Sequence, residues 1–188
     1  MACCKGTVLC VQVIPQRNSI SFDAMKKLLF SVFVVLVVVS CTSRAERAAD
    51  YNDRIIGSQK SIVDALVVMD STFSDTNSTK DWVDLNYANL QASVKRAILA
   101  LDSIGPFQED PSLQLSAKEL FRSYEALVDV EYKKLVEIKL LPAESVNMAI
   151  VDSNLAVQER IFSMSKIAQE RFYKAQEEFG KKYNLEFE

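Results

Sequence analysis

The sequence predicts an all-α protein, an antiparallel up-down-up-down four-helix bundle, and three observations support this fold. The 188 residues include only four glycines and four prolines, so few positions interrupt a helix. Apolar side chains recur every three or four residues along four long segments. The links between these segments have about 2 to 8 residues, the range found between antiparallel neighbours in a bundle.

The first two expected helices cover about residues 44–74 and 79–104. The apolar stripe of the first consists of Tyr51, Ile55, Gln59, Ile62, Leu66, Met69 and Phe73. The stripe of the second consists of Val83, Tyr87, Leu90, Val94, Ile98 and Leu101. Ser78 and Asp81 have the spacing of a capping box before the second helix, and Gly105 ends it.

The other two expected helices cover about residues 112–140 and 143–180. The stripe of the third consists of Leu113, Ala117, Leu120, Tyr124, Leu127, Glu131, Leu135 and Ile138. The stripe of the fourth consists of Val146, Ile150, Val157, Ile161, Met164, Ala168, Phe172, Ala175 and Phe179. Asp110 and Pro111 open the third helix, Pro142 opens the fourth, and Gly180 is its expected C-cap, so the bundle domain is expected over residues 49–180.

The composition excludes most familiar catalytic chemistry. The chain has no histidine, which removes Ser-His and Cys-His nucleophile pairs and the Glu-x-x-His ligands of di-iron bundles. Ser163 and Lys166 form a Ser-x-x-Lys sequence, but the Ser-Asp-Asn and Lys-Thr-Gly sequences of penicillin-recognising enzymes are absent. The sequence also contains no Asp-rich calcium loop. We therefore expect no enzymatic activity, no cofactor and no metal.

Two amides lie on or beside the first apolar stripe, namely Asn52 and Gln59. A buried amide needs a hydrogen-bond partner. The two side chains are expected either to form a polar pair that specifies packing or to line a ligand pocket.

The N-terminal part has the three parts of a secretory signal. Residues 25–27 are Met-Lys-Lys, residues 28–39 are apolar except for Ser31, and small residues precede Cys41. The apolar run is shorter than the roughly 18–20 residues that span a bilayer permanently. An uncleaved anchor and a buried valine-rich strand remain alternatives. Residues 1–24 fit no part of the signal, and we interpret them as a start codon assigned too early or as an extended leader.

The sequence Val-Val-Ser-Cys at residues 38–41 resembles the lipobox of bacterial lipoproteins, with Val38 in place of the more usual leucine. This resemblance implies that residues 25–40 are a signal peptide removed by signal peptidase II. It also implies that Cys41 carries lipid and that residues 41–48 are a short tether. Thr42 differs from the aspartate that retains such lipoproteins at the inner membrane, so the resemblance implies the outer membrane, facing either the periplasm or the cell surface.

The expected mature chain, residues 41–188, is acidic. Removing four basic residues and one acidic residue upstream of Cys41 from totals of 22 and 25 leaves 18 basic and 24 acidic side chains. A net charge of 18 minus 24, or −6, disfavours binding to nucleic acid or to anionic lipid. Attachment to a membrane is therefore expected through the lipid on Cys41.

Two features near helix ends suggest further sites. Ser71 and Ser103 lie in short sequences that resemble the Asp-Ser/Thr acceptor used for O-glycosylation of exported proteins in some Gram-negative bacteria. In the expected tail, residues 181–188, apolar Tyr183, Leu185 and Phe187 alternate with polar residues. Such a tail either adds as a strand to a partner, folds back on the bundle or is disordered.

The lipobox, the spacing of Tyr51, Asn52, Ile55 and Gln59, and the four-helix layout together resemble small bacterial surface lipoproteins of unknown function. The resemblance covers roughly residues 41–180 and implies no catalytic residue. Our first hypothesis is a non-enzymatic, lipid-anchored envelope protein whose bundle binds a protein or a cell-wall component. The alternative is a periplasmic carrier that holds a small apolar ligand in the bundle interior. A continuous cavity of a few hundred Å³ would distinguish the carrier.

Overall fold

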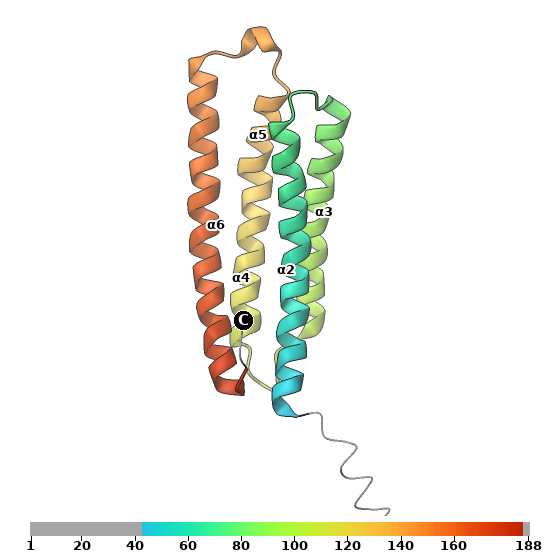
Figure 1. Cartoon of the computed structure of the whole chain (residues 1–188), viewed down its shortest axis with the longest axis vertical. Helices are drawn as coiled ribbons and strands as arrows, with labels where there is room; N and C mark the ends of the chain where they lie inside the picture. Colours follow the sequence, from blue (N-terminus) through green and yellow to red (C-terminus); the bar gives the residue numbers. More distant parts are fainter. Residues whose placement is uncertain (1–42, 186–188) are drawn as a thin grey trace, which may run out of the picture. The chain divides into compact units, whose positions relative to one another are not determined.

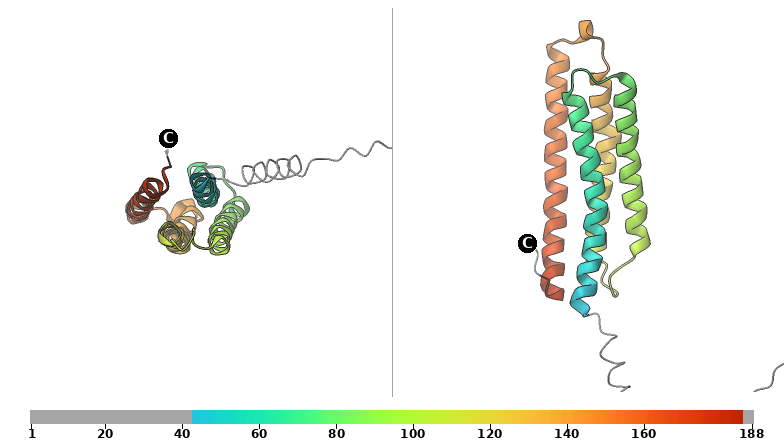
Figure 2. Two further views of the ribbon diagram at one scale, coloured as in Figure 1. Left: turned by 90° about the horizontal axis from the view of Figure 1, so that it is seen from below. Right: turned by 45° about the vertical axis from the view of Figure 1, so that its right-hand side comes forward.

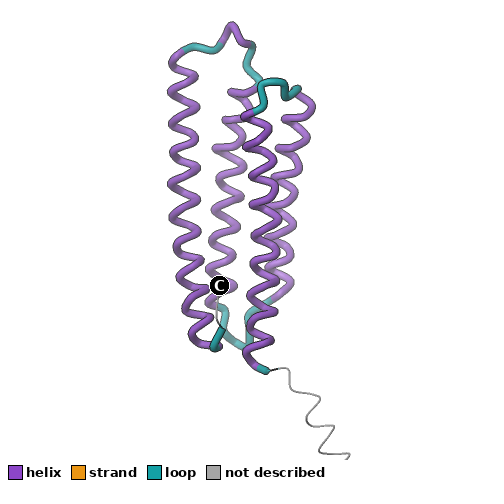
Figure 3. The backbone as a smooth tube through the Cα atoms, in the orientation of Figure 1, coloured by secondary structure: helices purple, strands orange, loops and turns teal. Residues whose placement is uncertain are grey.

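A computed structural model describes residues 43–185, and over these residues the protein is helical with no strand. Long helical segments lie side by side, joined by short loops (Figures 1 and 3). The elements are α2 (Arg44–Ser74), α3 (Lys80–Ile104), α4 (Ser112–Ala126), the π-helix η1 (Leu127–Tyr132), α5 (Lys133–Lys139), the 3₁₀ turn η2 (Ala143–Ser145) and α6 (Met148–Tyr183). The all-α prediction is confirmed. The expected signal peptide, Cys41 and residues 1–24 lie outside the described residues.

The packing is uneven among the helices. The largest interface joins α2 to α3, and α6 packs mainly against α4. Seen along the helix axes in Figure 2, α4 lies between α3 and α6. Within the described part of the chain no helix is both long and apolar enough to cross a membrane.

The start of α2 is fixed by a capping box. The Ser43 hydroxyl accepts a hydrogen bond from the Glu46 N–H at 3.0 Å, and the Glu46 carboxylate accepts one from the Ser43 N–H at 2.6 Å. Both otherwise unpaired backbone groups are thereby satisfied. The helix begins at Arg44 and Ala48 is already buried, so the helical domain starts ahead of the predicted boundary at residue 49.

The ends of α6 also differ from the prediction. Pro142 precedes the η2 turn, and α6 begins at Met148 after Asn147, whose side chain accepts a hydrogen bond from the Ile150 N–H at 3.2 Å. At the other end the helix continues through Gly180, and its C-cap is Asn184 in the left-handed conformation. Gly180 is therefore not the cap. The first three residues of the predicted tail at 181–188 belong to α6 instead.

Aromatic packing explains the longer α6. The Tyr183 ring lies 4.9 Å from the Phe107 ring and 4.6 Å from the Phe179 ring, centre to centre. Tyr51 of α2 joins the same cluster and donates a hydrogen bond from its hydroxyl to the Gly105 carbonyl at 2.7 Å. Burial raises the pKa of Tyr51 to about 12. Tyr183, expected as part of an alternating tail, is a core residue at the end of a helix.

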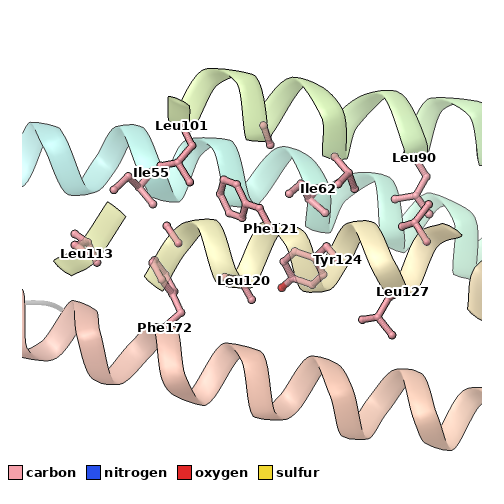
Figure 4. Packing of buried hydrophobic residues seen from close by; sticks show 14 of the residues in the cluster. Ile55, Ile62, Leu90, Leu101, Leu113, Leu120, Phe121, Tyr124, Leu127 and Phe172 are labelled. Atoms are coloured by element: carbon pink, nitrogen blue, oxygen red, sulfur yellow. The ribbon is translucent and has the colours of Figure 1, made fainter. Parts of the chain in front are cut away.

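The main core fills the space among α2, α3 and α4, as Figure 4 shows. Its largest fully buried side chains include Ile55, Ile62, Leu90, Leu101, Phe121 and Tyr124. Along η1 and α5 the buried residues come in adjacent pairs, at positions 127 and 128, 131 and 132, and 135 and 136. This segment lies between α6 on one side and α2 with α3 on the other, so each turn needs two inward positions.

Candidate functional site

The structure describes two of the three predicted modification sites, Ser71 and Ser103, and the Ser-x-x-Lys sequence at Ser163 and Lys166. Cys41, the expected lipidation site, lies outside the described residues. Ser71 and Ser103 are exposed, and each hydroxyl donates a hydrogen bond to a carbonyl of its own helix, at 2.9 Å and 2.7 Å. Ser163 is exposed on α6, and the Lys166 ammonium pairs with the Glu170 carboxylate at 3.9 Å. O-glycosylation at Ser71 and Ser103 stays a prediction.

The described residues contain no cluster of three or more acidic, cysteine or histidine side chains that could hold a metal ion.

The two amides of α2 do not pair with each other. The Asn52 side-chain oxygen accepts a hydrogen bond from Gln176 of α6 at 2.9 Å. Gln59 bonds to the Tyr124 hydroxyl, which also accepts a hydrogen bond from Gln169 of α6 at 3.0 Å. These bonds connect α2 and α4 to α6 and set the position of α6 along the bundle.

Gln169 and Gln176 were missed as partners in the sequence, although a signal was present. Asn52 and Gln59 are seven residues apart, and so are Gln169 and Gln176. In two antiparallel helices, equal spacing lets the first amide of one helix face the second of the other. The same register continued by one heptad places Leu66 opposite Phe162.

At that level α2 and α6 border a recess of about 440 Å³. We call it the α2–α6 recess. It is lined by Leu66, Asp70, Phe73, Ser74, Tyr132, Leu135, Gln158, Ile161, Phe162 and Ser165. A second hollow of about 310 Å³, which also includes Lys139, shares four lining residues with it, namely Phe73, Ser74, Leu135 and Gln158. The described helices therefore form a sizeable depression whose lining is half apolar and half polar.

Asp70 is the one acidic residue that lines the recess. Its carboxylate accepts a hydrogen bond from the Tyr132 hydroxyl at 3.1 Å. Asp70 is exposed as a residue, but partial desolvation of its carboxyl raises the pKa above its usual value, and the bond from Tyr132 opposes this shift. Burial likewise raises the pKa of Tyr132, and the nearby Asp70 charge adds to that rise.

No lysine or arginine among residues 43–185 lies within ion-pair distance of Asp70. Lys139 lines the neighbouring hollow, but its ammonium donates hydrogen bonds to the Phe73 carbonyl at 3.0 Å and the Asp75 carbonyl at 2.7 Å. It therefore caps the C-terminal end of α2. The charge of the Asp70 carboxylate therefore has no cationic partner among residues 43–185.

Glu131 has the opposite environment, because it is buried and has cationic partners, whereas Asp70 is exposed. Arg160 of α6 donates two hydrogen bonds to one Glu131 oxygen, at 3.1 Å and 2.9 Å, and the Lys134 ammonium lies 3.7 Å from the other. The bond from Arg160 lowers the pKa of Glu131. This explains a glutamate on the third apolar stripe: it connects η1 to α6.

Comparison with known proteins does not extend these observations, because no family model, curated protein or solved structure matches the chain.

Proposed function

We propose that the protein is a non-enzymatic, lipid-anchored cell-envelope protein, an up-down-up-down helical bundle that binds a protein or cell-wall partner. The anchor is argued from the sequence at Cys41, and the binding role from the surface of α6. The outer membrane, facing the periplasm or the cell surface, is the proposed location.

The observation that supports the proposed binding role is an exposed apolar stripe along the N-terminal half of α6. Met148, Leu155 and Phe162 follow one another at intervals of seven residues and are 73%, 55% and 72% exposed. Val151, also exposed, lies between the first two. We call these four residues the α6 stripe. Exposed apolar patches on protein surfaces commonly mark sites that bind another molecule.

The seven-residue spacing of the α6 stripe continues along the same helix to positions that contact neighbouring helices. Steps of seven from Phe162 reach Gln169 and Gln176, which bond to Tyr124 and Asn52. In the N-terminal half, Val157 is the one buried residue of α6. The positions that face neighbouring helices at one end are thus left uncovered at the other, and a partner that supplies apolar side chains would cover them.

Photo-crosslinking in intact cells tests the binding role. A photoreactive residue at Leu155 should yield a discrete protein or cell-wall adduct, identified by mass spectrometry. The matched control is Leu99 of α3, a leucine of similar exposure outside the α6 stripe. Identical adducts from both positions, or none from Leu155, would contradict a partner surface on α6.

Acyl labelling tests the anchor separately. Cys41→Ala should abolish incorporation of labelled palmitate and leave the precursor unprocessed, because the thiol that accepts the lipid is gone. Cys10→Ala, upstream of the expected cleavage site, should label and process normally. Labelling of the Cys41→Ala protein would disprove the lipoprotein assignment.

One observation favours the carrier as a second candidate. The α2–α6 recess has the volume of a small-molecule site and includes Leu66, Phe73, Leu135 and Ile161 from the predicted stripes. A carrier purified from its native membrane should release a stoichiometric apolar molecule on denaturation, detectable by mass spectrometry. Native protein without such a molecule would count against this candidate.

A further inference from the structure

The α2–α6 recess combines a carboxylate with aromatic rings. Asp70 and Phe73 line it from α2, Tyr132 from η1 and Phe162 from α6. The Phe73 and Tyr132 rings are stacked, with their centres 6.2 Å apart and their planes inclined by 28°. Three aromatic side chains from three helical segments thus border the same space as one carboxylate.

The electrostatics of this arrangement select for positive charge. An aromatic face is negative and attracts cations, most strongly where water is partly excluded. The Asp70 carboxylate adds a full negative charge, and the described protein supplies no cation to neutralise it. An anion would be repelled, and a neutral apolar molecule would leave the carboxylate desolvated.

A metal ion fits the recess poorly. Magnesium and calcium bind several oxygen ligands, with a preference for carboxylates, and retain water, whereas Asp70 is the one carboxylate among the ten residues that line the recess. An organic ammonium group carries its charge on a partly apolar surface and suits both the rings and the carboxylate. The polar amide of Gln158, which lines the recess from α6, offers an acceptor for an ammonium N–H.

We propose that the α2–α6 recess binds an organic cation, an ammonium group carried on an apolar body, with the charge beside Asp70 and against the aromatic side chains of Phe73, Tyr132 and Phe162. The apolar body lies against Leu66 and Ile161. The same chemistry is found in free amines and in a lysine side chain, and the test separates these sources. The inference depends neither on the lipid anchor nor on the α6 stripe as a partner surface.

The binding experiment is an NMR titration of the ¹⁵N-labelled full chain. The probes are benzyltrimethylammonium, which has no N–H, and Nα-acetyl-lysine methyl ester, which has three. Benzyl alcohol and phenylacetate are the neutral and anionic controls. The expected result is saturable shifts for a cation, clustered at residues 66–74 and 158–165, without such shifts for the controls.

The two cations distinguish the source of the ligand. Saturation by benzyltrimethylammonium alone indicates a free quaternary amine, and saturation by the lysine ester alone indicates a lysine side chain. Saturation by both supports an ammonium site of broad specificity. Absence of saturable binding by either cation, or equal binding of phenylacetate, overturns the proposal.

Variants separate the site from a structural role of Asp70. Asp70→Asn should weaken cation binding about tenfold or more, because the ion pair is lost. Phe162→Leu should weaken binding of the quaternary cation, and its exposure in the free protein means that the fold should persist. Asp64→Asn, an exposed change on the same helix, is the matched control and should bind normally. Unchanged affinity in Asp70→Asn overturns the proposal.

Thermal stability gives an independent readout. Asp70 is exposed, and the amide oxygen of Asp70→Asn can still accept the Tyr132 hydrogen bond, so this variant should unfold at nearly the wild-type temperature. If Asp70 served only as the acceptor for Tyr132, Asp70→Ala would lower the melting temperature, and the wild type would show no saturable cation binding. That combination would also overturn the proposal.

Discussion

Two phenylalanines on α6 allow a direct test of which part of this helix packs against the rest of the protein. Phe179 is 2% exposed, and its ring lies 4.6–5.9 Å from the rings of Tyr51, Phe107 and Tyr183. Phe162, on the same helix, is 72% exposed. The same substitution at both positions should therefore have very different costs.

Phe179→Ala should lower the free energy of unfolding by about 3–5 kcal/mol, the range for truncating a fully buried phenylalanine. The loss includes both the buried apolar area and contacts with three neighbouring rings. For a domain of this size the melting temperature should fall by roughly 10–20 °C. Phe162→Ala removes little buried area and should change stability by less than about 0.5 kcal/mol.

Urea and thermal unfolding of the purified variants, followed by circular dichroism, measure both effects. The slope of unfolding free energy against urea should stay unchanged, so that a shift in midpoint reports stability alone. A loss below about 1 kcal/mol for Phe179→Ala would refute the view that the aromatic cluster holds the end of α6. Equal losses for the two variants would refute the assigned difference in burial.

The two glycines with described surroundings should respond in opposite directions to alanine. Gly57 lies inside α2 with open space around an added Cβ, so Gly57→Ala should raise the free energy of unfolding by about 0.5–1 kcal/mol, measured by urea unfolding. Gly105 has a φ of 69° at the end of α3, a conformation that is strained for alanine, so Gly105→Ala should lower the free energy of unfolding by about 1–3 kcal/mol in the same assay. An added Cβ at Gly105 also meets no neighbour, so the expected loss comes from the backbone alone. Equal effects of the two substitutions would contradict this explanation. The third prediction concerns Asp110, whose carboxylate accepts hydrogen bonds from Lys182 at 2.6 Å and Ser112 at 2.7 Å, which hold its pKa below the usual range. The ionised form therefore stabilises the fold above the unfolded pKa of about 3.9, and this contribution is lost as the pH falls through the lower folded-state pKa. Asp110→Asn should cost about 1–2 kcal/mol at pH 7 and less near pH 2, and a cost independent of pH would exclude the ionic contribution.

The lengths and identities of the helices could be predicted closely from the sequence. The expected spans at residues 44–74 and 79–104 agree with α2 and α3 to within a residue, since their stripes and the stop at Gly105 are local signals. The start of α6 could not be predicted as well. Pro142 is a local start signal, but the chain first makes the η2 turn and begins the helix only at Asn147.

The recess could not be derived from the sequence, because it depends on how far α6 lies from α2. Asp70 falls outside the apolar stripe and gives no local sign that its carboxylate lines a recess. Tyr132 follows Glu131 directly, and a helix of ordinary pitch does not predict that both are buried. The π-helix η1 places one against α2 and the other against α6.

The sequence by itself determined that this is an all-helical protein, because helix formation depends on periodicity, capping and breakers within a few residues of one another. It also contains the motif at Cys41 from which the lipid anchor is proposed. Only the tertiary structure decided which amides bond to each other, which phenylalanines of α6 are buried and which side chains line the α2–α6 recess. These properties depend on distances between helices far apart in the chain, and no local pattern records them.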